Sequence, residues 1–246
     1  MRRLNYDDPV AITRDISWIG FYDEPAHLHC NPYILFDDDG EVVLIDPGSV
    51  PHFPIVMRKV IDLTPPENIT LIISQHQDPD VCGSLPVLED VIGRSDLKIA
   101  AHMNSIRLIR HLGVKSAFYP VDENDYRIEL KSGRVLDFIF TPYLHSPGAI
   151  MTYDSDTKSL FTSDIFGAVS KGWSLFAGEG FPENMASFHQ TYMPSNVILK
   201  SCMERIEKMD VDRILPQHGS IIEGKDIQVA TEYLKFLPCG IDLQED

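Results

Sequence analysis

The 246-residue sequence has no apolar run long enough to span a bilayer, and no signal-peptide-like apolar stretch follows its two N-terminal arginines. Basic residues are scarce: 21 lysines and arginines stand against 37 aspartates and glutamates, a net charge of −16. Such a surface repels phosphate backbones and anionic lipids, which argues against nucleic-acid and membrane partners. The sequence therefore predicts a soluble, cytoplasmic protein.

Cysteine is also rare, and the four cysteines show no paired close spacing. Free thiols in a reducing cytoplasm are expected in place of a disulfide framework. Internal repeats, low-complexity tracts and long linkers are absent as well. With 43% hydrophobic and 24% charged residues, the chain can bury a full core, and a single domain over residues 1–246 is expected.

Runs of alternating or fully apolar residues predict strands, and apolar residues at helical spacing predict helices. Strands or hairpins are expected at 14–22, 32–36, 41–49, 69–74, 97–101, 126–141, 149–154, 158–164 and 212–219. Helices are expected at 52–62, 84–93, 104–113, 183–209 and 225–237. Strands and helices fall into two similar halves, which favours a layered α/β sandwich.

The most informative stretch is SQHQDPDVCGS at 74–84, which follows an apolar run at 71–73. His76, Asp78 and Asp80 stand at alternate positions, so an extended or turning backbone directs their side chains the same way. One imidazole and two carboxylates that converge beyond a strand form a metal-binding arm.

Three further residues of ligand type follow strand-like segments: His145 after FIFTPYL, Asp164 after SLFTS and His218 after DRILPQ. Taken singly, each has an ordinary turn or structural role as the alternative, so the joint pattern carries the prediction. Ligands at several strand ends can meet at one edge of a sheet. Three imidazoles and three carboxylates exceed the four ligands of one zinc ion and indicate two ions that share a carboxylate. Hard oxygen donors favour iron or manganese, and two ions with open positions can bind dioxygen.

The segments that hold these residues resemble the metallo-β-lactamase fold, an αββα sandwich, and more narrowly its diiron branch, the flavodiiron proteins. The resemblance extends from ISWIG at 16–20 through LIDPG at 44–48 to LPQHGSI at 215–221. The first motif reads H-x-D-x-D-V, where hydrolases of the superfamily have H-x-H-x-D-H and flavodiiron proteins have H-x-E-x-D. YLHSPGAIMTYD and SLFTSDIFG are similar to later flavodiiron segments.

The resemblance implies two iron ions and a role for each candidate ligand. One iron is held by His76, Asp78 and His145, the second by Asp80 and His218, and Asp164 bridges the two.

Residues around these ligands also receive roles from the resemblance. Asp46 and Asn31 are implied to support the ligands from behind. Val81 stands where hydrolases have a further histidine, which implies an open position on the second metal. His29, His189 and Tyr192 are further candidates for the pocket, with core or surface positions as the alternative.

Flavodiiron proteins continue into a flavodoxin-like domain that binds FMN, whereas this sequence ends at Asp246 without one. No FMN is therefore expected within the chain. In that family two chains pack head to tail, so a homodimer is a further expectation.

Four functions remain open. The first is an oxygen sensor, in which a diferrous centre binds dioxygen and holds a diferric-peroxo state, with a chemotaxis or signalling protein as partner. The second is an oxygen or nitric oxide reductase served by an external electron donor. A metal-dependent hydrolase of the zinc type is less favoured, because Asp78 and Val81 depart from the hydrolase motif. A degenerate scaffold is least favoured, because the six-residue ligand set is intact.

Overall fold

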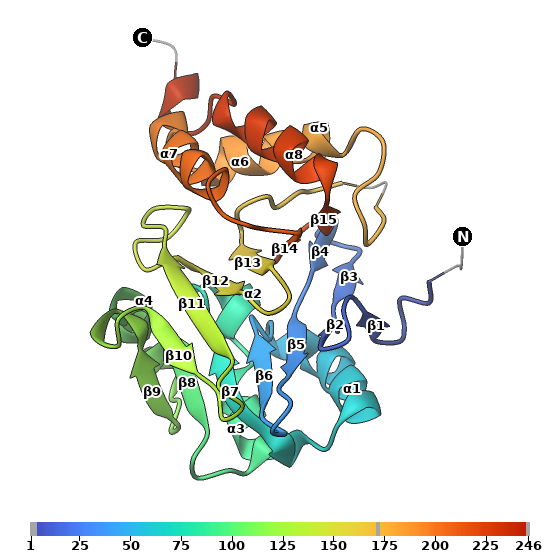
Figure 1. Cartoon of the computed structure of the whole chain (residues 1–246), viewed down its shortest axis with the longest axis vertical. Coiled ribbons are helices and arrows are strands. Elements are labelled where there is room, and N and C mark those ends of the chain that lie inside the picture. Colours follow the sequence, from blue (N-terminus) through green and yellow to red (C-terminus); the bar gives the residue numbers. More distant parts are fainter. Residues whose placement is uncertain (1–3, 171–172, 245–246) are drawn as a thin grey trace.

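Residues 4–170 and 173–244 are described in a computed structural model of the chain, in which two β-sheets lie between layers of helices (Figure 1). The first sheet contains, in spatial order, β1 (Val10–Ala11), β2 (Ile16–Trp18), β5 (Tyr33–Phe36), β6 (Val42–Ile45), β7 (Ile69–Ile73), β8 (Lys98–Ala101) and β9 (Ala117–Pro120). The second contains β10 (Arg127–Glu129), β11 (Val135–Phe140), β12 (Ile150–Asp154), β13 (Ser159–Ser163), β14 (Arg213–Pro216) and β15 (Ile222–Glu223). A separate hairpin joins β3 (Phe21–Asp23) and β4 (Leu28–Cys30).

Helices cover the outer face of each sheet. Against the first sheet lie α1 (Phe53–Leu63), α3 (Leu85–Ile92) and α4 (Met103–Ile109), and against the second lie α6 (Ala186–Tyr192), α7 (Asn196–Ile206) and α8 (Lys225–Lys235). Two short helices, α2 (Pro79–Cys82) and α5 (Phe181–Asn184), and 3₁₀ turns at Val50–His52, Pro66–Asn68, Arg110–Leu112, Val121–Glu123 and Ile241–Leu243 complete the described elements. The predicted αββα sandwich of the metallo-β-lactamase type is confirmed.

The layers follow from the alternation of side chains along the central strands. In β6, Val43 and Ile45 join the cluster between the sheets, whereas Leu44 packs with the helices below the first sheet. In β13, Phe161 faces the same inter-sheet cluster, and Leu160 faces the helices above the second sheet. Because successive side chains of a strand point to opposite faces, these apolar strands are buried on both sides.

Strand pairing brings several loops to one edge. The predicted hairpins are confirmed as the antiparallel pairs β5–β6, β10–β11 and β12–β13. In contrast, β6, β7 and β8 are parallel, as are β13 and β14. Parallel neighbours direct their carboxyl ends to the same edge, where α/β sheets build their sites.

Two predicted elements are divided. The strand expected at 14–22 is interrupted at Gly20, where an added Cβ would lie 2.2 Å from the carbonyl oxygen of Cys30. Beyond this close approach, the chain leaves the sheet and forms the β3–β4 hairpin. The helical segment expected at 183–209 is interrupted between Tyr192 and Asn196, where Pro194 lacks the amide hydrogen that a continuing helix needs.

The four cysteines are free and buried, as the sequence predicts. Within residues 4–170 and 173–244, no helix combines the length and the apolar character needed to cross a membrane.

Candidate metal centre

The six predicted ligands lie in loops and turns beyond strands of both sheets. His76 and Asp78 follow β7, His145 lies between β11 and β12, Asp164 directly follows β13, and His218 follows β14. The structure brings all of them into one cluster at the edge that the two sheets share.

The stretch at 76–80 differs from a continuous extended strand. Asp78 keeps an extended backbone, but Pro79 begins α2, so Asp80 lies on a helical turn. As a result, Asp78 faces His76 and His145, while Asp80 faces His218. The simple alternation expected from the sequence therefore holds for the first two residues only.

Asp164 stands at the centre, and its two oxygen atoms face different histidines. Oδ2 lies 2.8 Å from Nε2 of His145 and 3.6 Å from Nε2 of His76. Oδ1 lies 3.6 Å from Nε2 of His218. A carboxylate in this arrangement can serve one cation with each oxygen.

Two groups of donors surround these oxygens. In the first, Oδ2 of Asp78 lies 3.2 Å from Nε2 of His145 and 3.7 Å from Nε2 of His76. Potential ligand atoms of these three residues all lie within 4.8 Å of one another, close enough to hold one metal ion. In the second, Oδ2 of Asp80 lies 3.1 Å from Nε2 of His218.

Two buried atoms of the cluster have no hydrogen-bond partner. They are Nε2 of His76 and Oδ1 of Asp164. Buried polar atoms are nearly always paired, so these orphans indicate that the cluster is built to contact something else. Imidazole nitrogens and carboxylate oxygens are donors suited to iron, so the residues present fit a pair of iron ions.

Burial and neighbouring charges shift the pKa values of the residues in the cluster. Burial by itself lowers the pKa of His145, but hydrogen bonds to Asp164 and Asp78 outweigh it and raise the pKa to about 10. Burial likewise opposes the charge of His218, yet its hydrogen bond to Asp80 helps to raise its pKa well above the usual value. For Asp164, burial is outweighed by His76 and the other histidines, which hold its pKa far below the usual range. Metal binding must displace the imidazole protons.

Outer hydrogen bonds orient the histidine rings. Nδ1 of His76 lies 2.8 Å from the hydroxyl oxygen of Ser163, and Nδ1 of His218 lies 2.8 Å from the carbonyl oxygen of His29. Such contacts fix which ring nitrogen is free to bind a metal. The sequence interpretation missed Ser163, although its place directly before Asp164 was a usable signal.

Asp46 and Asn31 support the ligand loops. Asp46 accepts hydrogen bonds from the backbone and the side chain of Gln75, the residue before His76. Burial raises the pKa of Asp46 to about 6, although His76 and the bonds from Gln75 act in the opposite direction.

Asn31 acts on the loop that holds His218. It donates to the carbonyl oxygens of Pro216 and Gly219 and accepts a bond from Trp18. Gly219 has a φ of +84°, and an added Cβ would lie 2.8 Å from that of Ala168, so the loop requires glycine.

The predicted pocket residues occupy different positions. Tyr192 is half exposed, with its ring centre 5.8 Å from that of His145, and Phe188 lies between Tyr192 and His218. These two aromatic rings line one side of the cluster.

His189, Val81 and His29 are all buried. His189 accepts a hydrogen bond from the backbone of Phe166, and its other ring nitrogen bonds to Met185, so it braces the loop after Asp164. Val81 packs in the core cluster beneath the first sheet. His29 contacts His218 through its backbone carbonyl.

One side of the cluster is open to solvent. The side chains of Asp78, Asp80 and His145 are 32%, 38% and 20% exposed, whereas those of His76 and His218 are each 2% exposed. A small molecule can therefore approach from the carboxylate side.

The comparisons with known proteins agree with this fold. A sequence model of the family described as "ODP family beta lactamase" matches residues 28–219. The apo state of the chemotaxis sensor ODP from T. denticola is 28% identical, with a TM-score of 0.81, and the match covers 96% of each chain. A structure described as the peroxy diiron species of chemotaxis sensor ODP is 27% identical, with a TM-score of 0.79, and the match covers 96% of this chain and 97% of that chain.

Longer relatives match as well. The anaerobic nitric oxide reductase flavorubredoxin of Enterobacter sp. (strain 638) is 27% identical over 263 residues, which cover 96% of this chain and 52% of the relative. Across the first curated relatives, the matched part ranges from 32% to 56% of their length.

Proposed function

The chain belongs to the ODP family of β-lactamase-fold proteins, and from that premise we propose that it is a non-haem diiron protein that binds dioxygen as a sensor. The division of the donors into two groups about Asp164 is the observation that carries the proposal. His76, Asp78 and His145 would hold one iron, Asp80 and His218 would hold the other, and Asp164 would be shared between them. When bound in the ferrous state, the two ions would supply the electrons for reversible binding of dioxygen.

The protein's own residues orient the candidate histidine ligands and limit the size of the molecule that can bind. Ser163 and the carbonyl of His29 hold the rings of His76 and His218 so that each directs Nε2 to the cluster. Phe188 and Tyr192 limit the space on one side, which favours a small ligand over a bulky substrate. The solvent-exposed carboxylates leave a direct route of entry.

The signalling role is supported by the two solved neighbours, which are described as chemotaxis sensors. We propose a chemotaxis or other signalling protein as the partner, a homodimer as the working form, and the cytoplasm as the location. The acidic composition and four free cysteines support the last point.

A second candidate is an oxygen or nitric oxide reductase fed by a separate electron donor. It is favoured by the match to a relative described as an anaerobic nitric oxide reductase, although the match covers 52% of that relative. The two candidates share the metal centre and differ in whether the bound gas is released or consumed.

One experiment tests both. The chain is loaded with ferrous iron without oxygen, its iron is counted, and it then receives a pulse of oxygen. The sensor predicts about two irons per chain and a visible absorption band that persists. Many turnovers of oxygen or nitric oxide with a reduced donor would favour the reductase, and failure to take up iron would refute both.

A further inference from the structure

One cavity of the protein has none of the six candidate ligands in its wall. It has a volume of about 730 Å³ and lies between the N-terminal segment, the β3–β4 hairpin and α1. Its walls include Tyr6, Trp18, Tyr22, His29 and Trp173. Cavities of this size hold small organic ligands, and Trp18 and Trp173 are the two tryptophans of the sequence.

The aromatic rings of the cavity form a continuous stack. The ring of His29 lies 4.3 Å from that of Tyr22 and 4.0 Å from that of Trp173, and both pairs are nearly parallel. The ring of Trp173 also lies near those of Tyr6 and Trp18, with ring centres 4.7 Å and 6.1 Å away and the planes tilted. Flat π faces and ring edges around one space suit a planar aromatic molecule.

Two cations from α1 line the same cavity. Lys59 is buried, donates to the carbonyl oxygens of Tyr6 and Gly20, and holds its ammonium 4.1 Å from the ring centre of Trp18. Arg58 lies beside it, half exposed, and forms an ion pair with Asp62.

The balance of charge in this wall is positive. The lining contains these two cations and one carboxylate, that of Asp7, in a protein whose net charge is −16. Arg58, although paired with Asp62, is half exposed, so a negative group on a ligand in the cavity can share its guanidinium.

A buried polar atom in the wall has no partner. Nδ1 of His29 makes no hydrogen bond, and the residue is 2% exposed. Orphaned buried nitrogens are rare, and this one belongs to a residue that lines the cavity.

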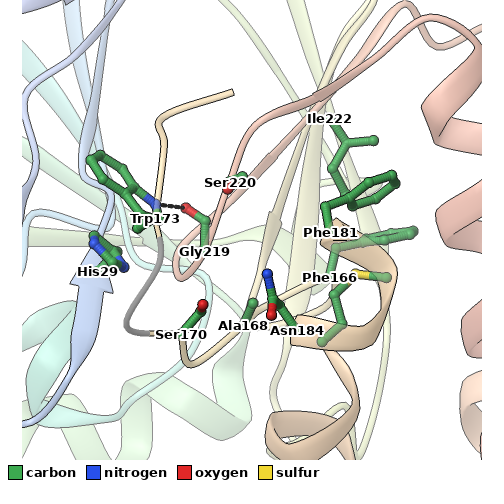
Figure 2. Close-up of a pocket in the computed structure, with 11 residues that line it drawn as sticks. His29, Phe166, Ala168, Ser170, Trp173, Phe181, Asn184, Gly219, Ser220 and Ile222 are labelled. Atoms are coloured by element: carbon green, nitrogen blue, oxygen red, sulfur yellow. Dashed lines mark hydrogen bonds between the residues drawn. The ribbon is translucent and has the colours of Figure 1, made fainter. Parts of the chain in front are cut away.

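The same aromatic wall is bonded to the loop of His218. Figure 2 shows Trp173 with its indole nitrogen directed at the carbonyl oxygen of Gly219, a distance of 2.9 Å, and His29 beside it. Trp18 reaches Gly219 through Asn31, and the carbonyl of His29 bonds to the ring of His218. A molecule that moves Trp173 or His29 must therefore act on the residues that position His218.

We propose that this cavity binds a planar aromatic anion and that its occupancy alters the metal affinity of the Asp80–His218 half of the centre. The binding step stands on the cavity alone, whereas the coupling step rests on the proposed diiron function. Coupling of this kind is reciprocal. If the anion changes the affinity for the metal by a given factor, the metal changes the affinity for the anion by the same factor.

Tryptophan fluorescence tests the binding step, because both tryptophans line the cavity. Anthraquinone-2-sulfonate is titrated into metal-free protein, with N-acetyltryptophanamide as the correction for absorbed light. We expect saturable quenching, about tenfold weaker binding for Arg58→Gln and for His29→Phe, and no change for Arg94→Gln, an arginine outside the cavity. Absence of saturable quenching, or equal affinity in Arg58→Gln and the parent protein, would overturn the proposal.

Cobalt(II) titration, followed by its visible bands, tests the coupling step in the presence and absence of the same anion. A changed affinity for one of two bound ions, matched by an equal change in the quenching midpoint, supports it. Equal cobalt affinity with and without the anion overturns it. Quenching without any metal uptake would refute the diiron function but not the anion site. Metal uptake without quenching would refute the anion site but not the diiron function.

Discussion

The hydroxyl oxygen of Ser163 lies 2.8 Å from Nδ1 of His76, and Ser163 is the last residue of β13, directly before Asp164. One strand end of the second sheet thus presents a candidate ligand, Asp164, and orients a histidine that follows the first sheet. The centre is complete only when the two sheets are docked against each other.

Replacement of Ser163 by alanine is expected to weaken iron binding by about 10- to 100-fold, because His76 loses the bond that orients its ring. Anaerobic titration against a competing chelator measures the affinity. Ser187→Ala, at an exposed position of α6, is the control and should bind iron normally. Unchanged affinity in Ser163→Ala would show that His76 is held by other contacts.

Asp164→Asn should reduce the iron content from about two ions per chain to one or fewer. The amide retains the shape of the carboxylate but loses the charge that both ions are proposed to share. Iron analysis after anaerobic loading and desalting gives the count. Asp137→Asn, on a half-exposed residue, should retain the parent iron content. Two tightly bound ions in Asp164→Asn would refute the bridging role.

Asn31→Ala is expected to lower the free energy of unfolding by about 2–4 kcal/mol. The change leaves the buried indole nitrogen of Trp18 without its acceptor and removes two bonds that hold the carbonyl oxygens of Pro216 and Gly219. Urea denaturation measures the loss, and Asn5→Ala, an exposed position, should stay within about 0.5 kcal/mol of the parent protein. If Asn31→Ala lowers the free energy of unfolding by only about 0.5 kcal/mol, water must take over the hydrogen bonds of the Asn31 side chain.

The stability of the protein should increase with pH above neutrality because of Lys59. Burial and the nearby Arg58 lower its pKa from 10.5 to about 8 in the folded chain. Between these values the unfolded chain binds a proton that the folded chain has released, so the free energy of unfolding rises as pH increases from about 8 towards 10.5. The full rise is about 3 kcal/mol. Below pH 8 the charged lysine destabilises the fold in full.

Denaturation at a series of pH values tests this effect. Lys59→Met should lack the rise, while Lys200→Met, at an exposed position, should retain it. If the parent protein and Lys59→Met show parallel stability curves, Lys59 remains charged in the folded state throughout this range.

Local patterns predicted most of the elements correctly. The apolar runs that become β6, β7 and β13 are recognisable because burial on both faces demands apolar residues at every position. The short strands β1, β4, β9 and β15 were missed. They have two to four residues, too few for a period to be visible.

The candidate ligands could also be found in the sequence, since residues of ligand type directly beyond strands are local features. The division of Asp78 and Asp80 between two groups was implied by the family resemblance, whereas residue spacing alone did not show it, because it depends on the turn of helix that begins at Pro79. The resemblance also implied a supporting role for Asn31. The hydrogen-bond partners of Asn31 and His29 could not be predicted, since they lie 188 and 189 residues away.

By itself, the sequence determined the four-layer sandwich and the types of donor that its strand ends present. Both follow from the spacing of apolar side chains and from the chemistry of single residues, which are visible within a few neighbouring positions of the sequence. Only the tertiary structure decided which oxygen of Asp164 faces which histidine and how each ring is held. Those contacts arise when two sheets dock and bring together atoms such as Ser163 Oγ and His76 Nδ1, 87 residues apart in the chain.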